Sequence, residues 1–189
     1  YIYKVDITDS QLVAQTYQRV KQDCGSVDIL INCAGIVRGN KTFDQQTVED
    51  IRLTMDVNTI APMVLTLQVL PDMLRRNCGH ICNIASAGGM LGNPKMSVYG
   101  ASKWAVIGWS ESMRIELQQQ KSNVRVTTVA PYFISTGMFT GVRSVFPILK
   151  PEPTAKKIIR AIERNTIFAG IPFKYHFIRF WQAILPLRL

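Results

Sequence analysis

The sequence has few of the residues that a metal site or a disulfide scaffold requires. Its 189 residues include four cysteines and two histidines. The cysteines are scattered along the chain, which argues against a small fold held together by disulfides and indicates a reducing compartment. His80 and His176 are far apart in the sequence, so no zinc-type ligand cluster is visible. We therefore expect no bound metal.

Long apolar runs are lacking as well. No run of about 18 apolar residues occurs, so no segment is predicted to span a bilayer. The chain opens with a strand-like segment instead of a basic, apolar and small-residue pattern, and no signal peptide is expected. Hydrophobic residues nevertheless make up 47% of the chain and charged residues 19%, which excludes disorder and predicts one domain with a substantial core.

Acidic residues are almost absent from the last third of the chain. Residues 121–189 contain eleven Lys and Arg but only Glu152 and Glu163, whereas residues 1–120 contain eleven residues of each sign. The whole net charge of +9 therefore belongs to the C-terminal part. This asymmetry points to an anionic partner such as a membrane surface, a nucleic acid or an acidic protein. The alternative is a solvated basic face.

Strand-like and helical segments alternate along the chain. Apolar, β-rich runs occur at residues 1–6, 27–32, 79–85 and 124–129, and a last short strand is predicted at 166–169. The run at 27–32 is typical of a strand buried on both faces. Helical segments lie between these runs, and the longest is interrupted near residues 58–62. The alternation predicts a parallel sheet with helices on both faces, whose ligands bind at the carboxyl ends of the strands.

Tyr99 and Lys103 are four residues apart on a predicted helix, so their side chains lie on one face. A lysine ammonium close to a phenol favours the phenolate and lowers the pKa of the tyrosine. Such a pair can act as a general acid and base. The motif alone is weak, because a half-buried tyrosine beside a solvent-seeking lysine gives the same spacing.

Further motifs accompany this pair, in a fixed order across residues 1–140. They are Asp6-Ile7-Thr8-Asp9, Asn32-Cys33-Ala34-Gly35, Asp56-Val57-Asn58, Ile84-Ala85-Ser86, Tyr99-Gly100-Ala101-Ser102-Lys103 and Pro131-Tyr132-Phe133-Ile134-Ser135-Thr136. Together they resemble the motifs of the short-chain dehydrogenases/reductases. The resemblance implies a doubly wound, Rossmann-like α/β fold that binds NAD or NADP.

The resemblance also implies a role for each matching residue. Tyr99 would exchange a proton with the substrate oxygen, Lys103 would lower the Tyr99 pKa and bind the nicotinamide ribose, and Ser86 would hold the substrate oxygen. Asn58 would anchor a water relay to Lys103. Asp6 and Ile7 would meet the adenine. The remaining cofactor-binding residues would be Asn32, Ala34, Gly35, Tyr99, Lys103, Pro131, Ile134 and Thr136.

The chain departs from the family pattern in three places. Cys33 replaces the second Asn of the Asn-Asn-Ala-Gly element, and Tyr132 replaces the Gly that follows Pro131. No Gly-x-Gly-x-x-Gly turn occurs in these 189 residues. We therefore expect an N-terminally truncated catalytic domain over residues 1–170, without its first βαβ unit and with a gap in the sheet.

The C-terminal third is similar to the membrane-associated epidermal retinol dehydrogenases and the 17β-hydroxysteroid dehydrogenases. Between Ala130 and Leu149 only Arg143 is charged, so the loop over the expected site suits a lipophilic alcohol or ketone, unless it simply packs on its own domain. The expected function is an NAD(P)-dependent oxidoreductase on a retinoid-, steroid- or long-chain-like substrate. The alternative is an inactive family member that serves as a binding or dimerisation module. No nucleic-acid motif accompanies the basic residues, so a nucleic-acid partner is not expected.

Two surfaces are expected to bind partners. The resemblance implies a homodimer through helices at about residues 48–76 and 98–119, with Val64, Trp104, Ile107 and Met113 as candidate contacts, although burial in their own subunit is the alternative. Residues 171–189 are predicted to form an amphipathic helix with Phe173, Phe177, Phe180, Trp181 and Ile184 on one face. That helix suits a membrane surface. The expected location is intracellular, at the endoplasmic reticulum or a lipid droplet if the source is eukaryotic, and otherwise in the cytoplasm. The alternative is a helix face packed on the substrate loop or on a partner subunit.

Overall fold

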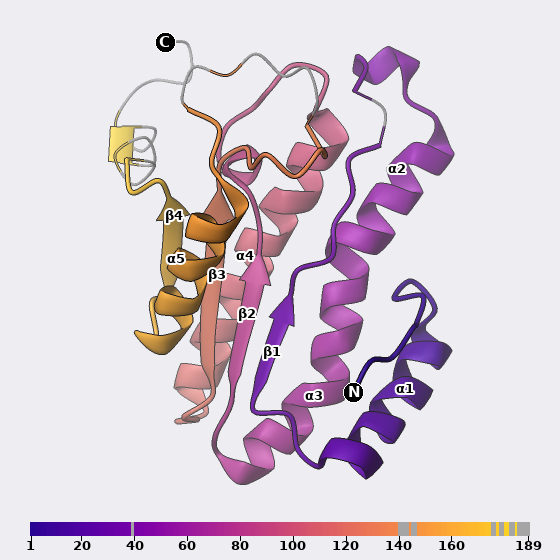
Figure 1. The fold of residues 1–189 in the computed structure, drawn as a ribbon, viewed down its shortest axis with the longest axis vertical. Helices are drawn as coiled ribbons and strands as arrows, with labels where there is room; N and C mark the ends of the chain where they lie inside the picture. The colour runs from indigo at the N-terminus through magenta and orange to yellow at the C-terminus, as the bar shows by residue number, and fades with distance from the viewer. Residues whose placement is uncertain are drawn as a thin grey trace.

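A computed structural model describes residues 1–38, 40–139, 144, 147–174, 177, 180–181 and 184. Its centre is a sheet of four parallel strands in the order β1-β2-β3-β4 (Figure 1). The strands are β1 (Ile29–Asn32), β2 (His80–Ile84), β3 (Arg125–Pro131) and β4 (Phe168–Ile171). This parallel sheet with helices between its strands confirms the predicted α/β class.

In the described part of the chain, five α-helices connect and cover the strands. They are α1 (Ser10–Cys24), α2 (Val48–Met55), α3 (Ala61–Arg76), α4 (Ser97–Gln119) and α5 (Pro151–Glu163). The Asp9 carboxylate caps α1 by accepting from two backbone N–H groups, and Gly25 ends it with a φ of 78°. The predicted interruption of the long helix is a π-helical turn, Asp56–Ile60, which joins α2 to α3 without a break.

The two faces of the sheet pack against different helices. Leu30, Ile81 and Val126 contribute to a core shared with α3 and α4, where Val69, Met73 and Met113 are buried. Cys82 and Val129 point to the opposite face and pack against Ile162 of α5. Helices therefore lie on both faces, as the sequence predicts.

The N-terminal segment differs from its prediction. Residues 1–6 form no strand, and the Ile2 side chain is 99% exposed. A β-strand is stable only when it pairs with a neighbour, and no described strand pairs with this segment. The predicted strand at 1–6 is therefore wrong for this structure.

β1 is less buried than predicted. It pairs with β2 along one edge, and no described strand pairs with its other edge. Ile29 and Ile31 are 52% and 47% exposed, because they point to the face covered by α5, and α5 packs over β3 and β4. Only Leu30 and Asn32 point into the core beneath α3.

One helical stretch bears on the prediction that no segment spans a bilayer. The stretch Val48–Arg76 is long and apolar enough to cross a membrane by length and composition, although no span was predicted. Its inner side packs on the sheet through Val69 and Met73, and an apolar core helix meets the same criterion of length and composition.

Four residues were predicted as dimer contacts. Ile107 and Met113 are wrong because both are buried in the core of their own subunit, whereas Trp104 is 55% exposed and Val64 is half-buried.

The predicted C-terminal helix at 171–189 lies largely outside the described residues. Within it, Phe177, Phe180, Trp181 and Ile184 are described and exposed. Phe173, which follows the carboxyl end of β4, is exposed as well.

Candidate active site

Ser86 and Tyr99 meet just beyond the carboxyl end of β2. Ser86 precedes a single 3-10 turn, Ala87–Gly89, and its Oγ accepts a hydrogen bond from the Gly88 N–H at 3.1 Å. The Ser86 hydroxyl is also hydrogen-bonded to Tyr99, in the first turn of α4. A Cβ built at Gly88 would lie 3.4 Å from the Tyr99 ring and 3.6 Å from Ser86 Oγ, so both side chains lie beside the backbone at Gly88.

Lys103 lies one helical turn after Tyr99 and is buried. Its Nζ donates a hydrogen bond to the Ile84 carbonyl oxygen at 3.0 Å, which ties α4 to the end of β2. Burial lowers the pKa of Lys103 to about 8, because the interior disfavours the charged ammonium. A Cβ at Gly35 would lie 3.3 Å from this Nζ, so the backbone after β1 passes directly beside the lysine.

Asn58 occupies the π-helical turn and is fully buried. Its Oδ1 accepts from the Ile36 N–H at 2.8 Å, and its Nδ2 donates to the Ile36 carbonyl at 2.9 Å and to Ser102 Oγ at 3.0 Å. The side chain therefore holds the loop after β1 against α4. Since Asn58 Oδ1 and Lys103 Nζ both lie 3.3 Å from a Cβ built at Gly35, the two groups share one side of the site.

An aromatic cluster covers Tyr99. The Phe139 ring meets the Tyr99 ring edge-on with 5.8 Å between centroids, and Phe133 packs on Phe139 at 4.9 Å. Burial raises the pKa of Tyr99, while the hydrogen bond from Ser86 lowers it. Lys103 Nζ is hydrogen-bonded to the Ile84 carbonyl oxygen, and the lowering of the Tyr99 pKa by Lys103 stays a prediction.

On the expected cofactor side, Asn32 ends β1 and is buried. Its Nδ2 donates to Asn83 Oδ1 at 2.7 Å and to Thr66 Oγ1 at 3.2 Å, and its Oδ1 has no hydrogen-bond partner among the described residues. Ala34 is exposed and Gly35 half-buried in the loop that follows.

The remaining predicted cofactor residues lie in two places. Pro131 ends β3 and is buried, Ile134 forms a bridge with Leu149, and Thr136 is exposed in the same loop. Asp6 lies before α1, where its carboxylate accepts from the Thr8 N–H and hydroxyl, which lowers its pKa. No described contact links Asp6 or Ile7 to the group around Lys103.

Sequence reasoning missed two residues of this site. Ser102 is fully buried, accepts from Asn58 and donates to the Tyr99 carbonyl oxygen, so it couples the π-turn to the first turn of α4. Its position next to Lys103 was the available signal. Phe139 gave no signal, because nothing in the apolar loop marks which of its aromatic residues reaches Tyr99.

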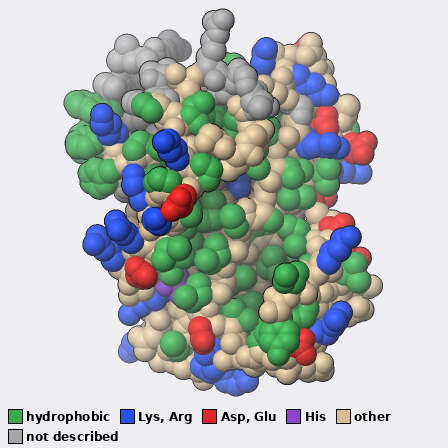
Figure 2. Space-filling model, viewed as in Figure 1, with side chains coloured by type: hydrophobic (Ala, Val, Ile, Leu, Met, Phe, Trp, Pro, Cys, Tyr) green, Lys and Arg blue, Asp and Glu red, His purple; other side chains and the backbone are tan. Residues whose placement is uncertain are grey.

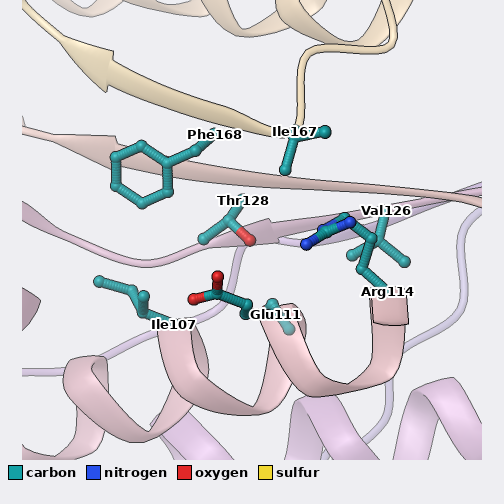
Figure 3. Close-up of a pocket in the computed structure, with 8 residues that line it drawn as sticks. Ile107, Glu111, Arg114, Val126, Thr128, Ile167 and Phe168 are labelled. Carbon is teal, nitrogen blue, oxygen red and sulfur yellow. The ribbon is translucent and has the colours of Figure 1, made fainter. Parts of the chain in front are cut away.

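The described cavities lie elsewhere. Figure 3 shows one of about 70 Å³ between α4, β3 and the start of β4, where Glu111 and Arg114 extend from α4 beneath Thr128 and Ile167. Another, of about 480 Å³, lies along α5 and β4. Neither is lined by Ser86, Tyr99 or Lys103. Among the described residues, no group of three or more His, Cys, Asp or Glu side chains could hold a metal ion.

Known proteins resemble this chain in sequence. It is 37% identical over 194 residues to epidermal retinol dehydrogenase 2 of Mus musculus, covering 100% of this chain and 62% of that protein. It is 36% identical over 193 residues to retinol dehydrogenase 10-A of Danio rerio, covering 98% of this chain and 57% of that protein. The chain thus spans about three fifths of the length of these curated relatives.

Solved structures resemble it in fold. The structure "ElxO with NADP Bound" matches with a TM-score of 0.83 and 23% identity, covering 94% of this chain and 78% of that one. Serine dehydrogenase from Escherichia coli matches with a TM-score of 0.76 and 28% identity, covering 90% and 74%. The family model described as short chain dehydrogenase matches residues 1–145. The chain belongs to the short-chain dehydrogenase family.

Proposed function

We propose that this chain carries the catalytic groups of an NAD(P)-dependent oxidoreductase that interconverts an alcohol and a carbonyl on a lipophilic substrate. The observation that carries the proposal is the convergence of Ser86, Tyr99 and Lys103 beyond the carboxyl end of β2. In open α/β sheets, this edge is where ligands bind.

Each of the three side chains has a chemical task in this proposal. The Tyr99 hydroxyl donates its proton to the carbonyl oxygen, or accepts one from the alcohol in the reverse direction. Ser86, hydrogen-bonded to Tyr99, holds the same substrate oxygen. The Lys103 ammonium stabilises the Tyr99 phenolate and binds ribose hydroxyls. The nicotinamide cofactor, when bound, supplies or accepts the hydride.

The described residues fit the nicotinamide half of such a cofactor. Lys103 uses one described hydrogen bond, to Ile84, which leaves further N–H donors for a ribose. Asn32 Oδ1 is a buried acceptor without a partner among the described residues. The sequence has no Gly-x-Gly-x-x-Gly turn that would hold the pyrophosphate. One structural neighbour was solved with NADP bound, and we infer NAD or NADP here.

The aromatic cluster over Tyr99 supports a lipophilic substrate. Tyr132 and Phe133 pack at 4.7 Å and continue the apolar surface formed by Phe139. A retinoid-, steroid- or long-chain-like molecule would replace the contacts between these rings with contacts of its own. The names of the curated relatives, which are retinol dehydrogenases, agree with this class.

The alternative function is that of an inactive binding or dimerisation module. The observation in its favour is that Phe139 covers Tyr99 and that burial raises the Tyr99 pKa. An enzyme must displace this ring to let substrate in, whereas a binding module need not.

Replacement of Tyr99 by phenylalanine separates the two functions. In the full-length protein, Tyr99→Phe should lower turnover of a retinol-like alcohol by about 10²–10⁴-fold, because one proton-transfer group is lost. Cofactor binding, measured by calorimetry, should be nearly unchanged. Tyr1→Phe, at an exposed position, is the matched control and should keep full activity. Retention of most activity by Tyr99→Phe would refute the assignment, and an inactive parent protein would favour the binding module.

Two partners complete the proposal. Leu67, Trp104 and Ile115 are exposed on α3 and α4 and are the proposed contacts of a homodimer. Exposed aromatic residues after β4 support association with an intracellular membrane, either the endoplasmic reticulum or a lipid droplet.

A further inference from the structure

A groove of about 480 Å³ runs between α5 and the outer strand β4. Its floor consists of β4 and the turn that follows, including Ala169, Ile171 and Phe173. Its rim is formed by Lys157 and Arg160 of α5 and by Arg164, which directly follows that helix. Figure 2 shows Lys and Arg side chains gathered at the left of this view, where α5 and β4 lie, with hydrophobic side chains close to them.

No acidic residue lines the groove beside the three rim cations. They are exposed, and their spacing of three and four residues places them on one side of α5. None of them forms an ion pair within the part of the chain that the structure describes. Glu152 pairs with Lys156 at 2.7 Å, and neither Glu152 nor Glu163 lines the groove. The groove therefore has an apolar floor beneath an uncompensated positive rim.

Large apolar side chains are exposed next to this rim. Phe173 lines one end of the groove and is 71% exposed, and its ring packs edge-on against Phe177 at 6.4 Å between centroids. Phe180 and Trp181 follow as a second ring pair, and both are exposed. Aromatic rings beside lysine and arginine are typical of segments that lie in a membrane interface.

The charge of the rim decides between the possible occupants. A second copy of this chain, seated on the same groove by two-fold symmetry, would bring Lys157, Arg160 and Arg164 close to their own counterparts, and this repulsion opposes the contact. A nucleic acid would satisfy the cations but would leave Phe173 and the rings after it in water. An anionic phospholipid satisfies both parts, because its phosphate meets the cations and its acyl region meets the apolar floor.

We propose that the α5–β4 groove binds the phosphate headgroup of an anionic phospholipid and docks the protein on a membrane surface. The proposal rests on the membrane association proposed above and names the site responsible for it. β2 and β4 are parallel, so Phe173, after the end of β4, lies at the same edge of the sheet as Ser86. The Phe173 end of the groove is therefore the end nearer to Tyr99, whereas Arg164 and Thr166 line its opposite end, before β4 begins.

The test compares two triple variants of the full-length protein with the same loss of charge. The groove variant is Lys157→Gln, Arg160→Gln and Arg164→Gln. The control is Lys4→Gln, Lys121→Gln and Lys156→Gln, at exposed positions that do not line the groove. Co-sedimentation is measured with vesicles of phosphatidylcholine alone and with added phosphatidylserine.

The groove variant should bind phosphatidylserine vesicles about 100-fold more weakly, since each cation near an anionic surface contributes about a factor of five. The control should lose much less, and the wild type should lose binding as salt is raised. Equal losses in both variants, or wild-type binding that does not require phosphatidylserine, would overturn the proposal. It would equally be overturned if the groove variant lost only self-association or only nucleic-acid binding.

Enzyme activity is read separately, on a lipophilic alcohol dissolved in detergent. Both triple variants should keep it, because none of the six residues lies near Tyr99. A protein that binds vesicles through the groove but lacks activity would contradict the proposed reaction and leave the lipid site in place. An active protein that ignores vesicles would contradict the lipid site alone.

Discussion

Lys103 is the residue at which the proposed chemistry conflicts with stability. Burial lowers its pKa from 10.5 to about 8. Between these two pH values the unfolded state binds more protons than the folded state, so the free energy of unfolding rises with pH. Below pH 8 both states carry the charge, and its burial costs the folded state about 3 kcal/mol.

Replacing Lys103 with methionine should therefore stabilise the protein at neutral pH. We expect Lys103→Met to raise the free energy of unfolding by about 1–3 kcal/mol and to remove its rise with pH, while turnover is lost. Urea denaturation at neutral pH and across pH 8 to 10.5 measures both effects. Lys95→Met, at an exposed position, is the control and should change neither. A Lys103→Met protein that is less stable at neutral pH would show that the buried ammonium is compensated.

At the scale of elements, the loop between β3 and α5 covers Tyr99. Its Phe139 ring lies between the Tyr99 ring and Phe133, and the Tyr132 hydroxyl accepts a hydrogen bond from Ser144 at 2.9 Å in the same loop. In the proposed reaction, the loop would thus present aromatic carbon to the substrate. The composition of the loop predicted an apolar surface over the site, but it did not predict that Phe139 is the residue that contacts Tyr99.

Truncation of that ring should change substrate preference. We expect Phe139→Ala to lower kcat/KM for a long apolar alcohol about tenfold, because an aromatic contact contributes up to about 1.5 kcal/mol. A short alcohol that does not reach the ring should be affected less. Phe43→Ala, an exposed phenylalanine far along the sequence, is the control. Equal losses for both alcohols would mean that Phe139 supports the fold and does not select the substrate.

Periodicity and motif order predicted most elements and the central group of the site. The spacing of Tyr99 and Lys103 predicts that both lie on one helix, and the apolar run ending at Ile84 predicts a strand that ends just before Ser86. Both predictions succeed because helices and strands leave a periodic pattern in the residues that form them. Pairing partners are not encoded locally. Residues 1–6 have the composition of a strand, but no described strand pairs with them. Ile29 is apolar yet half-exposed, because α5 does not extend over β1. The roles of Asn58, Asp6 and the other cofactor residues stay predictions.

On the scale of the whole molecule, exposed apolar residues gather on the outer sides of α3 and α4. Leu67 is 67% exposed and Trp104 55% exposed, and both helices use their inner sides for the core. Large aromatic residues at the centre of an interface contribute most of its binding energy. These two helices are therefore the proposed dimer contact.

A charge at this contact should separate the subunits. We expect Trp104→Glu to weaken dimerisation of the full-length protein by at least about 30-fold, since interface hot spots contribute about 2 kcal/mol or more. Sedimentation velocity over a range of concentrations measures the change. Ile159→Glu, which places the same charge at an exposed apolar position of α5, should leave the dimer intact. A monomeric wild type, or equal effects of both variants, would exclude this contact.

One edge of β1 pairs with no described strand, which has a practical consequence for residues 1–189 produced by themselves. A row of backbone N–H and C=O groups beside two half-exposed isoleucines is a template on which another molecule can add a strand. Such preparations are expected to polymerise through this edge and to become turbid as they are concentrated. A lysine in place of Ile29 or Ile31 would interrupt the template, because a charge on an edge strand resists being buried between two sheets.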